Sequence, residues 1–373
     1  MLKFINEELS QLKTDDLYRS LKTITQINGS KIIIDGNELI NFCSNDYLGL
    51  SQHPKVKERA IEAIKEFGTG SRASRLVCGN TILHEQLERK IAQFKGREAA
   101  IVFPTGFMAN LGAITSLVDE NDTVIIDHLD HASIVDACRL SKAKLQVYGH
   151  RDIVTLATIL KRSAKFSKRL IVTDSLFSMD GDLAPLPQII SLAKEYNAIT
   201  MIDEAHATGV IGSRGKGLEE HFNLIGQVDI LMGTLSKAIG SLGGFVAGSQ
   251  PLIDYLRNKA RSFIYTTALP PASCAAALAA FEIIESEPTL LASLKSNEKL
   301  LKAETPIIPI ITGGAERTMT LSRQLLERGL FVSGIRPPTV PEGQSRLRIT
   351  VTAQHSKEEI ECLASSLRQL TPA

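Results

Sequence analysis

The chain has 373 residues, of which 43% are apolar and 22% are charged, so it can bury a large core. Its 42 Lys and Arg residues nearly balance 41 Asp and Glu residues, which argues against a protein that coats nucleic acid or an anionic membrane. No apolar run approaches the ~20 residues of a membrane-spanning helix, residues 1–16 lack the apolar core of a signal peptide, and no two of the five cysteines are spaced as C-x-x-C. We therefore expect a cytoplasmic α/β enzyme with reduced thiols and with neither nucleic acid nor membrane as a partner.

The first elements predicted along the chain are a helix and a hairpin. Apolar residues recur at roughly helical spacing over residues 1–22, and Asp35-Gly36 separates two β-branched runs. From about residue 98, short apolar runs alternate with helix-length segments, which predicts a mostly parallel sheet covered by helices on both faces. The predicted strands of this sheet are 99–103, 124–127, 145–148, 170–174, 199–203, 230–233 and 245–247. Nearer the C-terminus, the pattern predicts helices over 320–328 and 357–370 and strands over 330–335 and 347–352.

This order of elements predicts three parts of the chain. We expect an N-terminal helix and hairpin segment over residues 1–45, a large α/β domain over 46–270 and a smaller α+β domain over 271–373. Several strands of the large domain end in polar residues. Because ligands of parallel sheets bind beyond the carboxyl ends of the strands, we expect the chemistry there.

One strand ends in Asp203-Glu204-Ala205-His206, four letters that also occur in a helicase motif. A helicase needs an upstream phosphate loop of the form G-x-x-x-x-G-K-[ST], whereas the nearest segment here, 209–217, lies downstream with different glycine spacing. A nucleotide-driven protein is therefore one alternative, and a surface Asp and His after a strand is another. The spacing of His128 and His131 would permit a metal pair, but no third ligand is evident, so no metal is expected.

A second strand ends in Thr234 and is followed by Ser236, Lys237 and a glycine-rich turn. An ammonium group is costly in such a place unless it is used covalently or its pKa is shifted, and the neighbouring hydroxyls suit a phosphate. A strand-to-helix turn at Gly106 would direct its first amides at the same anion. A lysine, a carboxylate and a phosphate site are what pyridoxal phosphate (PLP) requires.

These segments also carry a family resemblance. The spacing of Asp203 and Lys237, together with SNDYLGL at 44–50, GTGSRASRLVCG at 68–79, TGFMAN at 105–110, HLDHASI at 128–134 and SMDGD at 178–182, resembles the α-oxoamine synthases. The resemblance covers nearly the whole chain and implies a fold-type-I PLP-dependent transferase that works as a homodimer. The segment after Asn297 is shorter than in the family, which leaves the core chemistry alone but alters the small domain.

Residues 336–341 and 346–348 most resemble one branch of this family. That branch condenses L-alanine with pimeloyl-CoA or pimeloyl-acyl carrier protein, releases CO2 and serves biotin synthesis. Branches that use glycine or serine, and other PLP reactions such as transamination or aldol cleavage, are the alternatives.

The resemblance further implies roles for individual residues. Lys237 would hold PLP as an aldimine and remove the Cα proton, Asp203 would pair with the pyridine nitrogen, and His131 would stack on the ring and serve the substrate carbonyl. The other expected cofactor contacts are Gly106, Phe107, Ser178, His206 and Thr234. The expected substrate contacts are His131, Arg19, Thr339 and Arg348, with the Arg348 guanidinium gripping the amino-acid carboxylate.

Overall fold

The structure, a computed structural model, describes residues 2–370 and divides into two compact units. Unit 1 contains the chain up to Tyr47, residues 179–181 and the chain from Ala292 onward; unit 2 contains Leu48–Ser178 and Asp182–Leu291. This division differs from the expected boundary at residue 271, because helix α11 (Pro271–Ser286) packs against α2 (Pro54–Phe67) and α3 (Ile82–Lys95) of unit 2. That the three expected parts fold as domains stays a prediction.

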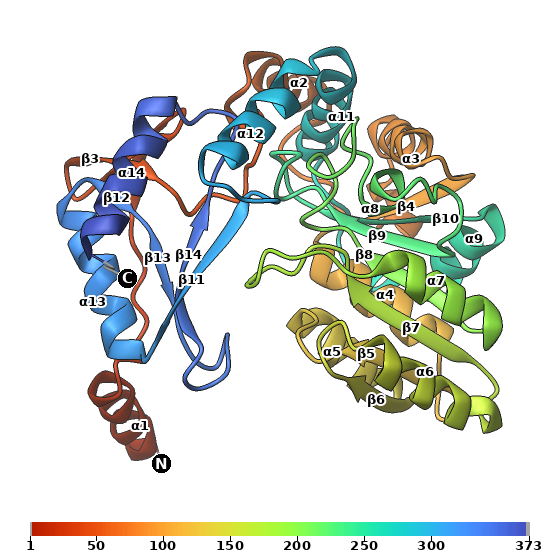
Figure 1. Ribbon diagram of the computed structural model, residues 1–373. Helices are drawn as coiled ribbons and strands as arrows, with labels where there is room; N and C mark the ends of the chain where they lie inside the picture. The colour runs from red at the N-terminus through yellow and green to blue at the C-terminus, as the bar shows by residue number, and fades with distance from the viewer. Residues whose placement is uncertain (1, 371–373) are drawn as a thin grey trace. The chain divides into compact units, whose positions relative to one another are not determined.

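Unit 2 is built on a seven-stranded sheet of order β4-β10-β9-β8-β7-β5-β6, in which every strand except β10 runs parallel (Figure 1). The strands are β4 (Ala99–Phe103), β5 (Thr123–Asp127), β6 (Lys144–Tyr148), β7 (Arg169–Asp174), β8 (Ile199–Asp203), β9 (Ile230–Thr234) and β10 (Gly244–Gly248). All seven predicted strands are present, each within one residue of its expected ends. The predicted mostly parallel sheet is therefore confirmed.

Helices cover both faces of this sheet. The remaining helices of unit 2 are α4 (Gly106–Leu117), α5 (Ala132–Ser141), α6 (Ile153–Arg162), α7 (Leu186–Glu195), α8 (Leu218–His221), α9 (Gln250–Lys259) and α10 (Arg261–Ile264), with short turns η1 (Leu50–Gln52), η2 (Arg75–Gly79) and η3 (Ser163–Lys165). One face packs against α4, α5, α9 and α10 through a fully apolar core that includes Ala113, Ile134 and Leu256. On the other face α3 contacts β4 and β10, and Phe94 of α3 packs against Phe281 of α11. Alternate strand residues therefore face two helical layers, which explains the uninterrupted apolar runs.

Unit 1 contains two small sheets, of order β1-β2-β3-β12 and β11-β14-β13. Its elements are α1 (Lys3–Thr14), β1 (Ile24–Asn28), β2 (Lys31–Ile34), β3 (Asn37–Asn41), β11 (Ile307–Gly313), α13 (Ala315–Glu327), β12 (Leu330–Phe331), β13 (Ser333–Ile335), β14 (Ser345–Thr350) and α14 (Lys357–Leu370), and α12 (Thr289–Leu300) spans its boundary with unit 2. Asp35 and Gly36 have φ angles of 51° and 79°, the left-handed pair that a two-residue hairpin favours. The predicted hairpin is therefore confirmed, whereas the helix expected over residues 1–22 ends at Thr14 and buries none of its side chains.

The N-terminal and C-terminal segments share one core in unit 1. Strand β3 pairs in parallel with β12, and Phe42 packs among Leu325, Leu347 and Leu363. The strand expected over 330–335 is two strands, because β12 pairs with β3 while β13 pairs with β14 in the other sheet. Among the described helices, none combines the length and the hydropathy that crossing a bilayer requires.

Candidate active site

Polar side chains gather at the carboxyl edge of the seven-stranded sheet. Asp127, Asp174, Asp203 and Thr234 are the last residues of β5, β7, β8 and β9, which lie side by side in that order. The register pairs Asp174 directly with Asp203. Parallel pairing thus brings together strand ends that lie far apart in the sequence, as the sequence predicts.

Asp203 is a buried carboxylate with donors on both oxygens. Its side chain is 3% exposed, its Oδ2 accepts a 2.7 Å hydrogen bond from Asn110 Nδ2, and its Oδ1 accepts one of 2.8 Å from the Ala205 amide. His206, which is also buried, lies in the turn that follows. The two donors fix the carboxylate in one orientation at the edge of the sheet, and its remaining lone pairs can accept a further N–H group.

The first turn of α4 lies against the ends of β9 and β10. Thr105 caps the helix by accepting from the Met108 amide at 3.1 Å. A Cβ added at Gly244 would lie 2.6 Å from the Gly106 nitrogen, and one added at Gly106 would lie 3.4 Å from Thr234 Oγ1. Glycine at both positions therefore allows the helix N-terminus and Thr234 to come together, which makes a cradle for an anion. In this structure the Thr234 hydroxyl donates to the Gly243 carbonyl at 2.8 Å.

Lys237 lies in a short loop that the backbone ties down at several points. The Leu235 amide donates to the Gly243 carbonyl at 2.9 Å, and the Gly240 amide donates to the Lys237 carbonyl at 2.8 Å. Gly240 has a φ of 67°, and a Cβ there would lie 2.3 Å from the Ser51 nitrogen, so only glycine fits. The loop holds the half-buried Lys237 three residues after the end of β9.

His131 begins helix α5 and is held through its backbone by a buried carboxyl. Its amide donates to Asp174 Oδ2 at 2.8 Å. Burial, reinforced by the neighbouring Asp203, raises the pKa of Asp174 well above its ordinary value. Although the His131 residue is exposed, desolvation by the surrounding protein and the charge of Lys237 lower its pKa against the opposing effect of Asp203. The lowered pKa of His131 favours the neutral form of its ring.

The other predicted cofactor contacts of unit 2 lie in turns at this edge. Ser178 is half-buried in the turn between Leu176 and Leu183, which form an isolated bridge, and Phe107 is 45% exposed in the first turn of α4. In the part of the chain that the structure describes, no group of three or more His, Cys, Asp or Glu side chains could hold a metal.

The predicted substrate residues Arg19, Thr339 and Arg348 lie in unit 1. Arg348 of β14 is buried and donates to Asn45 Oδ1 at 3.2 Å. Arg19 donates to the Pro337 carbonyl at 3.0 Å, which ties the N-terminal segment to the loop that presents the exposed Thr339. Arg19 and Thr339 are thus brought near each other through the Pro337 loop.

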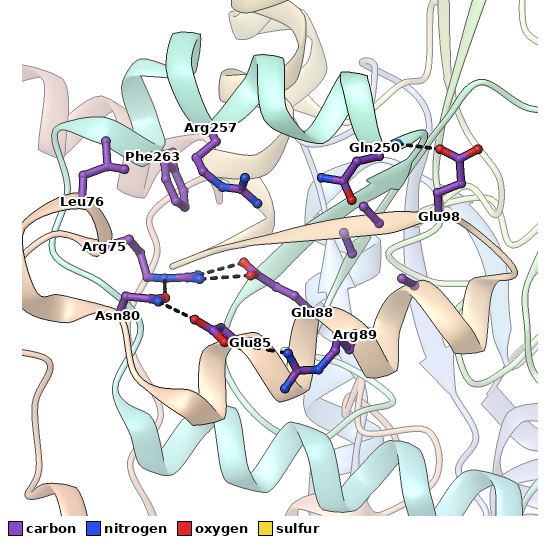
Figure 2. Close-up of a pocket in the computed structure, with 13 residues that line it drawn as sticks. Arg75, Leu76, Asn80, Glu85, Glu88, Arg89, Glu98, Gln250, Arg257 and Phe263 are labelled. Atoms are coloured by element: carbon purple, nitrogen blue, oxygen red, sulfur yellow. Dashed lines mark hydrogen bonds and ion pairs between the residues drawn. The ribbon is translucent and has the colours of Figure 1, made fainter.

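A pocket of about 430 Å³ in unit 2 is a separate feature (Figure 2). The side chains that line it belong to η2, α3, β4, α9 and α10, and the residues Lys237 and Asp203 are not among them. Arg75 makes a bidentate ion pair with Glu88 at 2.9 and 3.0 Å and donates to Asn80 at 2.6 Å, as Figure 2 shows. Arg75, Glu88 and Asn80 therefore satisfy one another's hydrogen-bonding groups.

The residues at the carboxyl edge fit PLP. The cradle of Gly106, Phe107 and Thr234 would hold its phosphate, and Asp203 would accept from its pyridine N–H. Lys237 is the amine that would bind its aldehyde, with His206 and Ser178 in adjoining turns. The fit rests on the close approach that Gly106 and Gly244 permit and on the donors that fix Asp203.

Sequence reasoning did not assign Asn110, Ser133 or Asp174 to the site. Asn110 and Ser133 were read only as parts of longer segments, and Asp174 only as a strand end. A usable signal was present, since Asn110 is a polar residue among the apolar residues of the first turns of α4, and a buried polar side chain needs a partner.

Comparisons with known proteins place the chain in a family. Residues 37–367 match the model of the aminotransferase class I and II family. An 8-amino-7-oxononanoate synthase from Thermoanaerobacter pseudethanolicus is 46% identical over 382 residues, which covers 99% of this chain and 97% of that protein. A serine palmitoyltransferase from S. paucimobilis with a bound PLP–myriocin aldimine superposes with a TM-score of 0.93 at 30% identity, covering 99% of this chain and 98% of that one. The 8-amino-7-oxononanoate synthase from Francisella tularensis superposes with a TM-score of 0.77 at 30% identity, over 89% of this chain and 98% of that one. With the geometry above, these matches show that the chain belongs to the 8-amino-7-oxononanoate synthases, PLP-dependent acyltransferases of fold type I.

Proposed function

We propose that this protein condenses L-alanine with a pimeloyl thioester, with loss of CO2, to give 8-amino-7-oxononanoate for biotin synthesis. The observation that carries the proposal is the meeting of Asp203, Thr234 and Lys237 on adjoining strand ends, in a chain nearly half identical to enzymes of that name. PLP bound there would supply an electron sink for the charge that develops at the alanine Cα.

Residues of unit 2 bind the cofactor and transfer the protons. Asp203 would bind and keep the proton on the pyridine nitrogen of PLP, the Gly106 and Phe107 amides with Thr234 would bind its phosphate, and His206 and Ser178 would bind its hydroxyl oxygen. Lys237 removes the proton from the alanine Cα and returns one to the product carbon. His131 would lie against the PLP ring and would donate a hydrogen bond to the carbonyl oxygen of the incoming thioester.

The residues of unit 1 recognise the substrates. Arg348 binds the carboxylate of alanine as a planar two-pronged donor, for which Asn45 already fixes the guanidinium. Arg19 and Thr339 bind the acyl substrate, for which their shared anchor at Pro337 is the supporting contact. Coenzyme A and an acyl carrier protein are both anionic, and either would present the same pimeloyl group.

We further propose that the protein is a cytoplasmic homodimer. Leu76, Val77 and Tyr265 of unit 2 are 54%, 79% and 71% exposed, and we expect a second copy to cover them. The five cysteines are all free thiols, in keeping with a reducing compartment. Sedimentation velocity would test the dimer, since a monomer at micromolar concentration contradicts it.

The function is tested by substrate selection. Purified protein loaded with PLP is given L-alanine, glycine or L-serine with pimeloyl-CoA or pimeloyl-acyl carrier protein, and the product mass and CO2 are measured. Formation of 8-amino-7-oxononanoate with alanine alone supports the proposal, whereas a preference for glycine or serine moves the protein to another branch. Lys237→Ala should abolish turnover and the absorption band of lysine-bound PLP. Lys259→Ala, which removes an exposed lysine of α9, should leave both unchanged.

A further inference from the structure

A line of hydrogen bonds joins His131 to Asp203 through two buried side chains. Asn110 Nδ2 lies 2.7 Å from Asp203 Oδ2 and 2.9 Å from Ser133 Oγ, and Ser133 Oγ lies 2.8 Å from His131 Nδ1. Asn110 and Ser133 are each 1% exposed. Buried contacts of this length are strong and well oriented, so their donors and acceptors can be assigned in order.

The order begins at Asn110. If the amide were reversed, its oxygen would lie 2.7 Å from the Asp203 carboxylate, where two acceptors repel each other, so the NH2 group must face Asp203. The same NH2 group reaches Ser133 Oγ, which therefore accepts. In this orientation Asn110 Oδ1 is a buried oxygen with no hydrogen-bond partner, which costs free energy. The two hydrogen bonds of the NH2 group, to Asp203 and Ser133, hold the amide in this orientation despite that cost.

The order ends at the His131 ring. The Ser133 backbone amide, which can only donate, bonds Nδ1 at 3.2 Å, so Nδ1 must be an acceptor without a proton. Because Ser133 Oγ already accepts from Asn110, its own hydrogen is available for the same nitrogen. Nδ1 thus receives two donors, and the single proton of the neutral ring lies on Nε2.

We propose that Asn110 and Ser133 are positioning residues that lock His131 as the neutral tautomer protonated at Nε2, so that it serves the reaction as a hydrogen-bond donor rather than as an imidazolium acid. A neutral N–H group aimed at a carbonyl oxygen stabilises the negative charge that develops there and keeps its own proton. The lowered pKa of His131 agrees with this neutral form. That His131 Nε2 donates to a substrate carbonyl rests on the proposed function, whereas the assignment of the His131 tautomer does not.

The tautomer is tested directly by NMR. The nitrogen shifts of the eight histidines are recorded on ¹⁵N-histidine-labelled protein loaded with PLP, and His131→Gln identifies the His131 signals. We expect Nδ1 without a proton and Nε2 with one in the wild-type protein, and a mixture of tautomers in Ser133→Ala. Ser141→Ala is the matched control, because it removes another buried serine hydroxyl of α5 that bonds Cys138 and Ala143 instead. A proton on Nδ1 in the wild type, or an unchanged ring in Ser133→Ala, overturns the proposal.

Kinetics separate a positioning role from a merely structural one. Ser133→Ala should lower kcat about 10- to 100-fold, less than the ~10²–10³ lost when one oxyanion donor is removed, because the His131 ring itself remains, while the alanine KM and the PLP dissociation constant stay within about twofold. Ser133→Thr keeps the hydroxyl and should recover most of the lost rate. Asn110→Leu also removes a donor from Asp203, so it should weaken PLP binding as well as release the tautomer.

The two proposals fail in different ways. If the protein makes no product from pimeloyl thioesters while the NMR result holds, the proposed function is wrong and the tautomer lock stands. If turnover is as expected but Ser133→Ala has the kcat of Ser141→Ala, the lock is wrong and the function stands.

Discussion

Replacing Lys95 by methionine should destabilise the protein far more than a lysine substitution usually does. Lys95 Nζ forms an ion pair with Glu204, the residue after Asp203, and donates to the Lys216 carbonyl at 2.8 Å. The two side chains are 0% and 1% exposed, so Lys95→Met leaves a carboxylate buried without its counter-charge. Removing one partner of such a pair costs about 3–5 kcal/mol. At ~2–4 °C per kcal/mol for a unit of this size, the expected drop in Tm is about 6–20 °C.

The assay is thermal unfolding followed by circular dichroism at a fixed, saturating PLP concentration, because a bound ligand itself raises Tm. Lys90→Met is the matched control, since Lys90 lies on the same helix and is 15% exposed, and its partner Glu285, at 40% exposed, stays in contact with water when the lysine is removed. Exposed pairs contribute at most ~1 kcal/mol, so this control should lose no more than about 4 °C. Equal losses in the two variants would refute the reasoning from burial.

Three further outcomes are expected. Gly244→Ala should raise the PLP dissociation constant measured by equilibrium dialysis, because its Cβ would lie 2.6 Å from the Gly106 nitrogen, whereas Gly70→Ala, with open space around it, should not. Although burial opposes it, hydrogen bonds to Asp127 and Asp182 raise the pKa of His150 to about 9. The stability that protonated His150 contributes is therefore full below about pH 6.5 and is lost as the pH rises through about 9. In urea unfolding, the stability of the wild type should fall more between about pH 7 and 9.5 than the stability of His150→Gln. Parallel curves for the two proteins would contradict this. Arg348→Lys should raise the alanine KM about 10- to 100-fold with PLP binding unchanged, because lysine cannot make the paired hydrogen bonds, and an unchanged KM in steady-state assays would place the carboxylate elsewhere.

The strands of the large sheet were predictable because each is a short apolar run with a polar end. A strand that is buried on both faces must be apolar at nearly every position, so the run marks the strand. The placement of Asp203 and Thr234 at one edge follows from the same rule. The split of residues 330–335 was not predictable, because it depends on two different pairing partners, β3 and β14, that are remote in sequence.

Contacts between segments that are remote in the sequence could not be predicted either, and some of them form part of the site. The proline pair at 270–271 suggested a boundary, but the apolar face of α11 matches α2 and α3, and nothing local to the prolines encodes that match. Asn110 and Ser133 lie 23 residues apart, and only the packing of α4 against α5 makes them neighbours. The two family motifs TGFMAN and HLDHASI contain one of these residues each and assign a role to neither.

The path of the chain through the two units limits how this protein can be divided. It passes from one unit to the other after Tyr47, Ser178, Gly181 and Leu291, and the middle two crossings enclose only residues 179–181. Within unit 1, Asp180 of this short insert forms an ion pair with Arg346 at 2.6 Å, and the Gly181 carbonyl accepts from Thr305 at 2.6 Å. No single cut can therefore release an intact unit, and a fragment ending at residue 291 would retain the insert while losing the strand that anchors it. Unit 1 on its own would therefore have to be assembled from three separate segments of the chain, the middle one only residues 179–181.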